Sequence, residues 1–140
     1  MEEPFALIDR LRRAAALVAP GDDGGMESGR GFEVRLAVAQ LHEIHALSEG
    51  EAASGAGLAL GCALTMGARP ILWLRTEAAE RQGGRLHGPG LVAMGLDPAD
   101  LVVVVVADDA ALLRAAADGA RCPGLGTVIA EGWGRCAGWT

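Results

Sequence analysis

The sequence predicts an α/β fold in which a mainly parallel sheet is flanked by helices on both faces. Two observations lead to this fold class. Between residues 32 and 131, short apolar or β-branched runs of strand length alternate with stretches of helical spacing or composition. Strands joined through an intervening helix normally pair in parallel, because the crossover returns the chain to the same end of the sheet.

The first part of the chain is expected to stand apart from this core. Apolar side chains from Phe5 to Val18 recur at helical spacing and predict an N-terminal helical arm over residues 1–20. A polar stretch rich in glycine predicts a flexible linker over residues 21–31. We therefore expect the arm to be only loosely tied to the core.

Four short strands are expected in the core, and the last three are runs of mainly apolar residues. The five consecutive valines make the third of the four too β-branched for anything but a buried strand. The expected strands cover residues 41–45, 71–74, 101–106 and 126–131.

Three helices are expected between these strands. The first is built from small residues, the second is short and ends at Gly95, and the third is rich in alanine. Asp108 and Asp109 are expected to cap the third helix, where the helix dipole favours carboxylates. The expected helices cover residues 55–66, about 90–94 and 109–118, and residues 132–140 are expected to form an irregular tail.

Composition limits the classes of function. A chain of 140 residues is expected to form one domain, and 51% apolar content with 21% charge excludes a disordered protein. The net charge of −6 argues against a surface built throughout to hold nucleic acid, although a local arginine patch is allowed.

The cysteines and the apolar segments indicate the cellular compartment in which the protein is expected. Cys62, Cys122 and Cys136 are odd in number and form no C-x-x-C pair, which favours reduced thiols in a cytoplasmic protein. The acidic start is not typical of a signal peptide, and no stretch reads as a convincing membrane span. We expect a soluble, cytoplasmic protein without a membrane partner.

The segment after the first expected strand has the glycine spacing of a phosphate-binding loop. Gly50 and Gly55 fall at the two glycine positions of G-x-x-x-x-G-K-[ST], with Ser54 between them. Ala56 and Gly57 stand where the lysine and the magnesium-binding hydroxyl belong. We therefore expect a degenerate nucleotide loop with no catalytic residue and no cofactor. Weak binding of ATP and Mg²⁺ is the alternative, and a tight strand-to-helix turn is the structural explanation of the same spacing.

Acidic residues at strand ends are a second group of candidates. Glu77 follows the second expected strand and Glu131 ends the last one. A carboxylate in either place could polarise water or position magnesium, although acids at strand ends are ordinary.

Arginines and histidines supply the remaining candidates. Arg75, Arg81 and Arg85 belong to a polar stretch that could contact DNA phosphates or an acidic partner. His42 and His45 would point to opposite faces of a strand, so no metal site is expected there.

These residues together resemble a known family. The run Leu41-His42-Glu43-Ile44, followed by the degenerate loop and the small-residue helix, resembles RecA-type recombinase cores and, more specifically, the ImuA family of damage-inducible mutagenesis accessory proteins. The resemblance spans roughly residues 32–131. Its supporting segments are residues 70–74, 85–91 and 95–98.

The resemblance implies a RecA-like, P-loop-type core in a non-catalytic accessory protein of SOS-induced translesion DNA synthesis, which is an error-prone form of DNA repair. The implied partners are an ImuB-like Y-family pseudo-polymerase and an error-prone polymerase. By position, Glu77 matches the catalytic glutamate of RecA-type proteins and Glu131 matches the acid that closes the Walker B strand. The N-terminal helix matches an arm used for self-association.

RecA-like cores continue with further strands, one of which lies between the first and last strands expected here. The chain is therefore expected to be a shortened member with an incomplete sheet, whose open apolar edge favours self-association. Two alternatives stay open, namely a P-loop ATPase with a degenerate nucleotide site and an SOS-linked inhibitor of cell division.

Overall fold

The computed structural model describes residues 36–133 of the chain. The arm and linker expected over residues 1–31, and the tail from residue 134 onwards, lie outside the described residues. In chain order the elements are the 3-10 helix η1 (Glu49–Glu51), α2 (Ala52–Met66), β1 (Ile71–Thr76), α3 (Glu77–Gly83), α4 (Gly88–Ala93), the 3-10 helix η2 (Pro98–Asp100), β2 (Leu101–Val106), α5 (Asp109–Arg121) and β3 (Thr127–Glu131).

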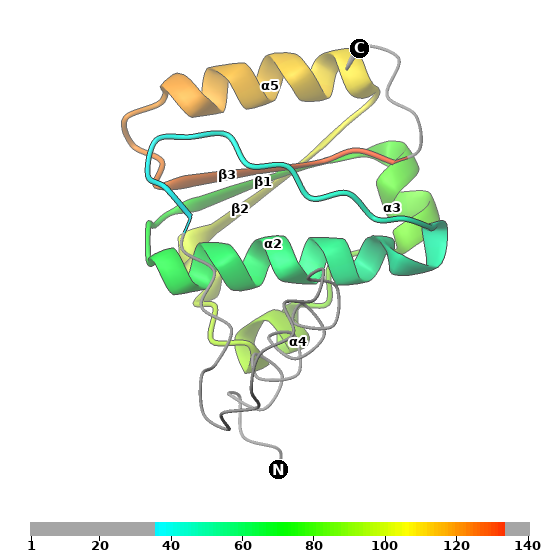
Figure 1. Ribbon diagram of the computed structural model, residues 1–140, viewed down its shortest axis with the longest axis horizontal. Coiled ribbons are helices and arrows are strands. Elements are labelled where there is room, and N and C mark those ends of the chain that lie inside the picture. The colour runs from blue at the N-terminus through cyan, green and yellow to red at the C-terminus, as the bar shows by residue number, and fades with distance from the viewer. Residues whose placement is uncertain (1–35, 134–140) are drawn as a thin grey trace, which may run out of the picture.

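The three strands form one parallel sheet in the order β2-β1-β3. The first strand in sequence is thus the central one, and Trp73 lies opposite Val103 on one side and Ile129 on the other. Helix α5 lies on one face of the sheet and α2 on the other (Figure 1). The predicted α/β class, with a parallel sheet between helices, is confirmed.

The core is packed on both faces of β1. On one face Leu60 and Ala63 of α2 bury Ile71 and Trp73, together with Leu96. Each fully buried leucine or isoleucine side chain contributes about 1.5–3 kcal/mol to the free energy of unfolding.

Helix α5 approaches the opposite face closely. Leu112 is completely buried, and Gly119 lies so near the strands that an added Cβ would be 2.9 Å from the Cδ2 atom of Leu72. The Asp108 carboxylate accepts a 2.7 Å hydrogen bond from the Ala111 N–H, so the predicted cap of this helix is confirmed.

The charged stretch after β1 was not assigned to an element by the sequence pattern. It forms α3, whose first turn is capped by Thr76, since the Thr76 hydroxyl accepts a hydrogen bond from the Ala79 N–H at 3.1 Å. The helices within residues 36–133 are not of the length and apolar character that crossing a membrane requires.

The strand predicted over residues 41–45 is wrong. These residues are extended but belong to no strand, and they are exposed, with Leu41 at 89% and Ile44 at 42%. A strand is defined by hydrogen bonds to a neighbour, and the sheet ladder does not reach this segment. A partner strand for this segment is absent from residues 36–133.

The prediction that the valine run is buried is also wrong, although the run does form β2. Its four central valines are 37–48% exposed, since β2 lies at the edge of the sheet and the flanking helices pack mainly on β1 and β3. An all-apolar run is typical of a strand covered on both faces, but the composition does not determine how many neighbours the strand has.

Candidate functional site

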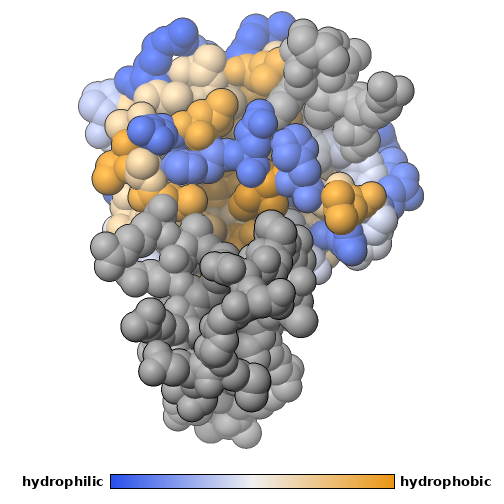
Figure 2. Space-filling view, in the orientation of Figure 1, coloured by the Kyte–Doolittle hydropathy of each residue, from blue (hydrophilic) through white to orange (hydrophobic). Residues whose placement is uncertain are grey.

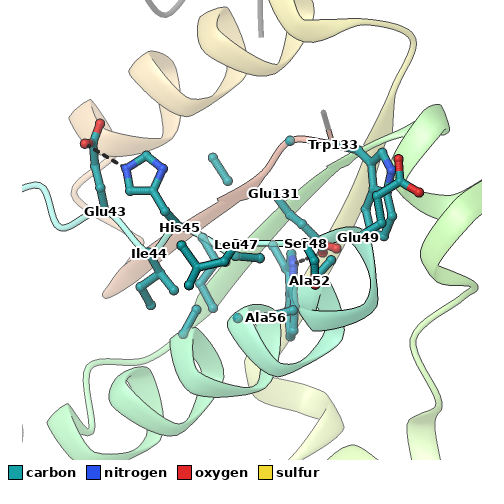
Figure 3. Close-up of a pocket in the computed structure, with 17 residues that line it drawn as sticks. Glu43, Ile44, His45, Leu47, Ser48, Glu49, Ala52, Ala56, Glu131 and Trp133 are labelled. Carbon is teal, nitrogen blue, oxygen red and sulfur yellow. Dashed lines mark hydrogen bonds and ion pairs between the residues drawn. The ribbon is translucent and has the colours of Figure 1, made fainter. Parts of the chain in front are cut away.

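A pocket of about 550 Å³ lies beside β3, on the face of the sheet that α2 covers. Its walls are the extended segment 43–48, the first half of α2, and the end of β3 with Trp133 (Figure 3). Glu43 and His45 lie at one end of the pocket, and Glu49, Glu131 and Trp133 lie at the other (Figure 3). Figure 2 shows a hollow on the side of the molecule towards the viewer, with hydrophobic residues in its floor and hydrophilic residues along its upper rim.

A buried ion pair closes the second end. Arg75 and Glu131 are register partners on β1 and β3. The Nε atom of Arg75 donates to Oε2 of Glu131 at 2.8 Å, and Nη2 donates to Oε1 at 3.1 Å. The side chains are only 3% and 14% exposed. This is the bidentate geometry in which a guanidinium binds a carboxylate most strongly.

Other groups complete the hydrogen bonding of this pair. The Trp73 Nε1–H donates to Oε2 of Glu131 at 3.0 Å, because Trp73 and Arg75 are two positions apart on one strand and share a face. The Nη1 atom of Arg75 donates to the Gly84 carbonyl at 2.8 Å and to a Glu80 carboxylate oxygen at 3.3 Å. The charges are thus satisfied by groups from β1, α3 and β3.

The predicted arginine contacts divide into two groups. The guanidinium of Arg75 is buried in the ion pair and is not exposed to a partner in this structure, so its contact with DNA or a partner stays a prediction without support from its position. Arg81 and Arg85 are 71% and 89% exposed, with carboxylates at 3.6 Å for Arg81 and 3.7 Å for Arg85. Both side chains are accessible because they are exposed, and exposed ion pairs of this kind hold them only weakly. Their contact with DNA or a partner stays a prediction.

The two acidic candidates lie at the carboxyl ends of the adjacent strands β1 and β3. Glu77 begins α3 directly after β1, and its exposed carboxylate lies 3.6 Å from Arg81. Glu131 ends β3, and both its oxygens accept hydrogen bonds from the chain. The environments of the two carboxylates therefore differ, since one is solvated and the other is paired.

The predicted loop over residues 48–57 is largely helical. Gly50 lies in η1, whereas Ser54, Gly55, Ala56 and Gly57 lie in α2, which begins at Ala52 without a side-chain cap. A helix over these residues leaves no open loop to wrap a phosphate chain. Gly55 instead lies where the extended segment crosses the helix, since an added Cβ would be 3.7 Å from Ile44 and 3.9 Å from Ala46.

The histidines near the pocket form local contacts. His42 Nε2 lies 3.1 Å from the Ala37 carbonyl oxygen, and His45 Nε2 lies 3.4 Å from a Glu43 oxygen. Among residues 36–133, no three His, Cys, Asp or Glu side chains are grouped closely enough to hold a metal ion.

Two tryptophans of the site were missed by the sequence reasoning. From the sequence, Trp73 is predicted only as part of a strand and Trp133 only as part of the irregular tail. Trp133 is instead half-buried near Gly83, where an added Cβ would be 3.3 Å from the indole ring. Its Nε1 atom is buried without a hydrogen-bond partner among the described residues. Of the residues in this cluster, the sequence pattern singled out Arg75 and Glu131 but offered no signal for the two tryptophans.

Comparisons with known proteins add no relative to this description. The chain matches no protein-family model, and no curated protein or solved structure matches it. What the chain itself defines is a class of fold, namely an α/β domain with three parallel strands between helices.

Proposed function

We propose that this chain is a non-catalytic, RecA-like accessory protein of SOS-induced translesion DNA synthesis, acting through protein–protein contacts. The named process and partners rest on the resemblance of residues 32–131 to the ImuA family. The non-catalytic role rests on one structural observation, which is the ion pair between Arg75 and Glu131.

This ion pair bears on nucleotide chemistry because Glu131 is the residue matched to the Walker B acid. An acid that positions Mg²⁺ must present its oxygens to the metal or to metal-bound water. Both Glu131 oxygens instead accept hydrogen bonds from buried donors. Releasing the carboxylate would leave the buried Arg75 charge without its main partner, which costs on the order of 3–5 kcal/mol.

The start of α2 supports the same proposal. Ala56 and Gly57 offer neither an ammonium group nor a hydroxyl to a phosphate, and they lie inside a helix. The carboxylates of Glu49 and Glu51 precede that helix and would repel a triphosphate.

A role in protein binding is supported by the apolar surface. Leu41 and Leu47 are almost fully exposed, and the central valines of β2 are about two-fifths exposed. These are two separate groups of exposed apolar side chains, one beside β3 and one on β2, and exposed apolar surface is where partners bind soluble domains.

The test is a pair of binding measurements with the purified chain. Isothermal titration with ATP and Mg²⁺ should give no micromolar binding and no turnover. A purified ImuB-like pseudo-polymerase should bind the chain without nucleotide, whereas a cell-division GTPase, used as the matched control, should not. ATP hydrolysis, or binding to the GTPase in preference to the pseudo-polymerase, would overturn the proposal.

A further inference from the structure

The outer edge of β3 presents unpaired backbone groups to the pocket. The Thr127 N–H donates to the Pro70 carbonyl at 3.3 Å, which places the backbone groups of Thr127 on the β1 side. Alternate residues of a parallel strand bond to the same neighbour, so Ile129 and Glu131 also face β1. Val128 and Ala130 therefore direct their N–H and C=O groups outwards, where β3 has no strand neighbour among residues 36–133.

The opposite wall of the pocket is also extended backbone. Residues 43–48 run alongside β3 and in the same direction (Figure 1), with the pocket between them. Residues 44–47 make no backbone hydrogen bond within the described part of the chain. The pocket thus lies between two stretches of chain whose outward backbone groups have no partner within residues 36–133. Together they form a row of donors and acceptors rather than a single polar point.

The remaining walls show what side chains would fit. Small residues of α2 form one wall, and these are Ala52, Gly55, Ala56 and Ala59. They leave room for larger apolar side chains directed towards the helix. The carboxylates at the ends are those of Glu43, Glu49 and Glu131, of which Glu131 is paired with Arg75 behind it, and no arginine of residues 36–133 lines the pocket. A basic side chain is therefore favoured at either end over an acidic one.

We propose that this pocket binds an extended, basic-and-apolar peptide segment of a partner protein, which pairs as an additional strand with the outer edge of β3. Strand addition satisfies a row of backbone groups, while pockets for alternate side chains provide the specificity. A compact small molecule would satisfy only one or two of these groups. The inference rests on the proposed role in partner binding and specifies its mode.

The probe is a synthetic peptide of about seven residues, a common strand length, in which valine and threonine alternate and arginine stands at both ends. Its binding is measured by fluorescence anisotropy on the full chain. A peptide of the same sequence with N-methylated backbone amides is the first control, and one with glutamate at both ends is the second. We expect the parent peptide to bind and each control to bind at least about tenfold more weakly, as the loss of a few hydrogen bonds or ion pairs would cause.

Two further measurements locate the bound strand. The variant Ala130→Pro removes the outward N–H. No bond to β1 is lost, because the Ala130 N–H points away from β1, and proline is tolerated at such edge positions. This variant should bind the peptide about tenfold more weakly, whereas Ala130→Ser, which keeps the N–H, should bind as the wild type does. Hydrogen exchange on the wild-type chain needs no variant, and the peptide should slow exchange at the Val128 and Ala130 amides while leaving Ile129 unchanged.

The inference is overturned if no peptide binds, if N-methylation has no effect, or if exchange at Val128 and Ala130 is unchanged on binding. Its failure is distinguishable from failure of the proposed function. If Ala130→Pro binds the pseudo-polymerase as tightly as the wild type, the inference of strand addition is wrong, whereas the proposed partner is supported. If the peptide binds as described but the pseudo-polymerase does not, the proposed partner is wrong, whereas the inferred mode of binding is supported.

Discussion

Arg75 and Glu131 lie opposite each other on adjacent parallel strands and are joined by two hydrogen bonds of 2.8 and 3.1 Å. Because this pair is buried, the two side chains are expected to be coupled energetically. Glu131→Gln, which leaves the guanidinium without its counter-charge, should lower the free energy of unfolding by about 3 kcal/mol. Urea denaturation of Arg75→Met, Glu131→Gln and the double variant gives the coupling energy. Additive effects would show that the pair does not act as a unit, and Arg81→Met, which removes an exposed pair, is the matched control.

Gly126 is expected to tolerate no side chain. An added Cβ would overlap the backbone of Ala68 and Arg69, next to the hydrogen bond from the Gly126 N–H to the Pro70 carbonyl. Backbone cannot rotate away as a side-chain terminus can, so Gly126→Ala should lower the free energy of unfolding by about 3 kcal/mol. Gly88→Ala is the control, since an added Cβ there meets no atom within 4 Å. Equal urea midpoints for the two variants would contradict the expected close approach.

The exposed edge of β2 is expected to promote self-association. The strand carries no charge, proline or bulge to discourage pairing with another chain. Val104→Lys should therefore shift the chain towards the monomer in size-exclusion chromatography over a concentration series. Val92→Lys introduces the same charge on α4, at a valine that is 51% exposed, and should not. A wild-type chain that is monomeric at every concentration would refute this prediction.

The two described cysteines should differ in reactivity. Burial raises the pKa of the Cys62 thiol, while Cys122 is exposed. The thiolate is the reactive form, so iodoacetamide should modify Cys122 well before Cys62, as peptide mass spectrometry would show. The raised pKa also means that the unfolded thiol ionises first as the pH rises. The unfolding free energy should then decrease above the pKa of the unfolded thiol, about 8.5, and Cys62→Ser should remove this contribution. Faster labelling of Cys62 would contradict the prediction.

The sequence predicted the elements whose signals are local. Five adjacent valines and the Asp108 cap depend on residues close in the chain, and both produced the expected strand and helix. What could not be predicted was the environment of those elements. Whether valines at an edge are covered, or whether an extended segment such as residues 41–45 finds a partner, depends on strands far away in sequence.

The candidate site shows the same division. Glu131 was identified because it ends a strand, but its role differs from the one expected, since the register places it beside Arg75. A register between strands separated by more than fifty residues cannot be deduced from either strand alone. The helical start of α2 was missed because its glycine spacing matches a loop motif that is common in a chain with 21 glycines.

The strand order has a consequence for how the domain folds. The central strand β1 is synthesised before both strands that flank it, so its first neighbour follows only with residues 101–106 and its second with residues 127–131. Most of the sheet therefore consists of contacts between distant parts of the chain, which slow folding and lengthen the time that apolar strands remain uncovered. The nascent polypeptide should be most vulnerable to aggregation, and most dependent on chaperones, after β2 has been made and before β3 can dock.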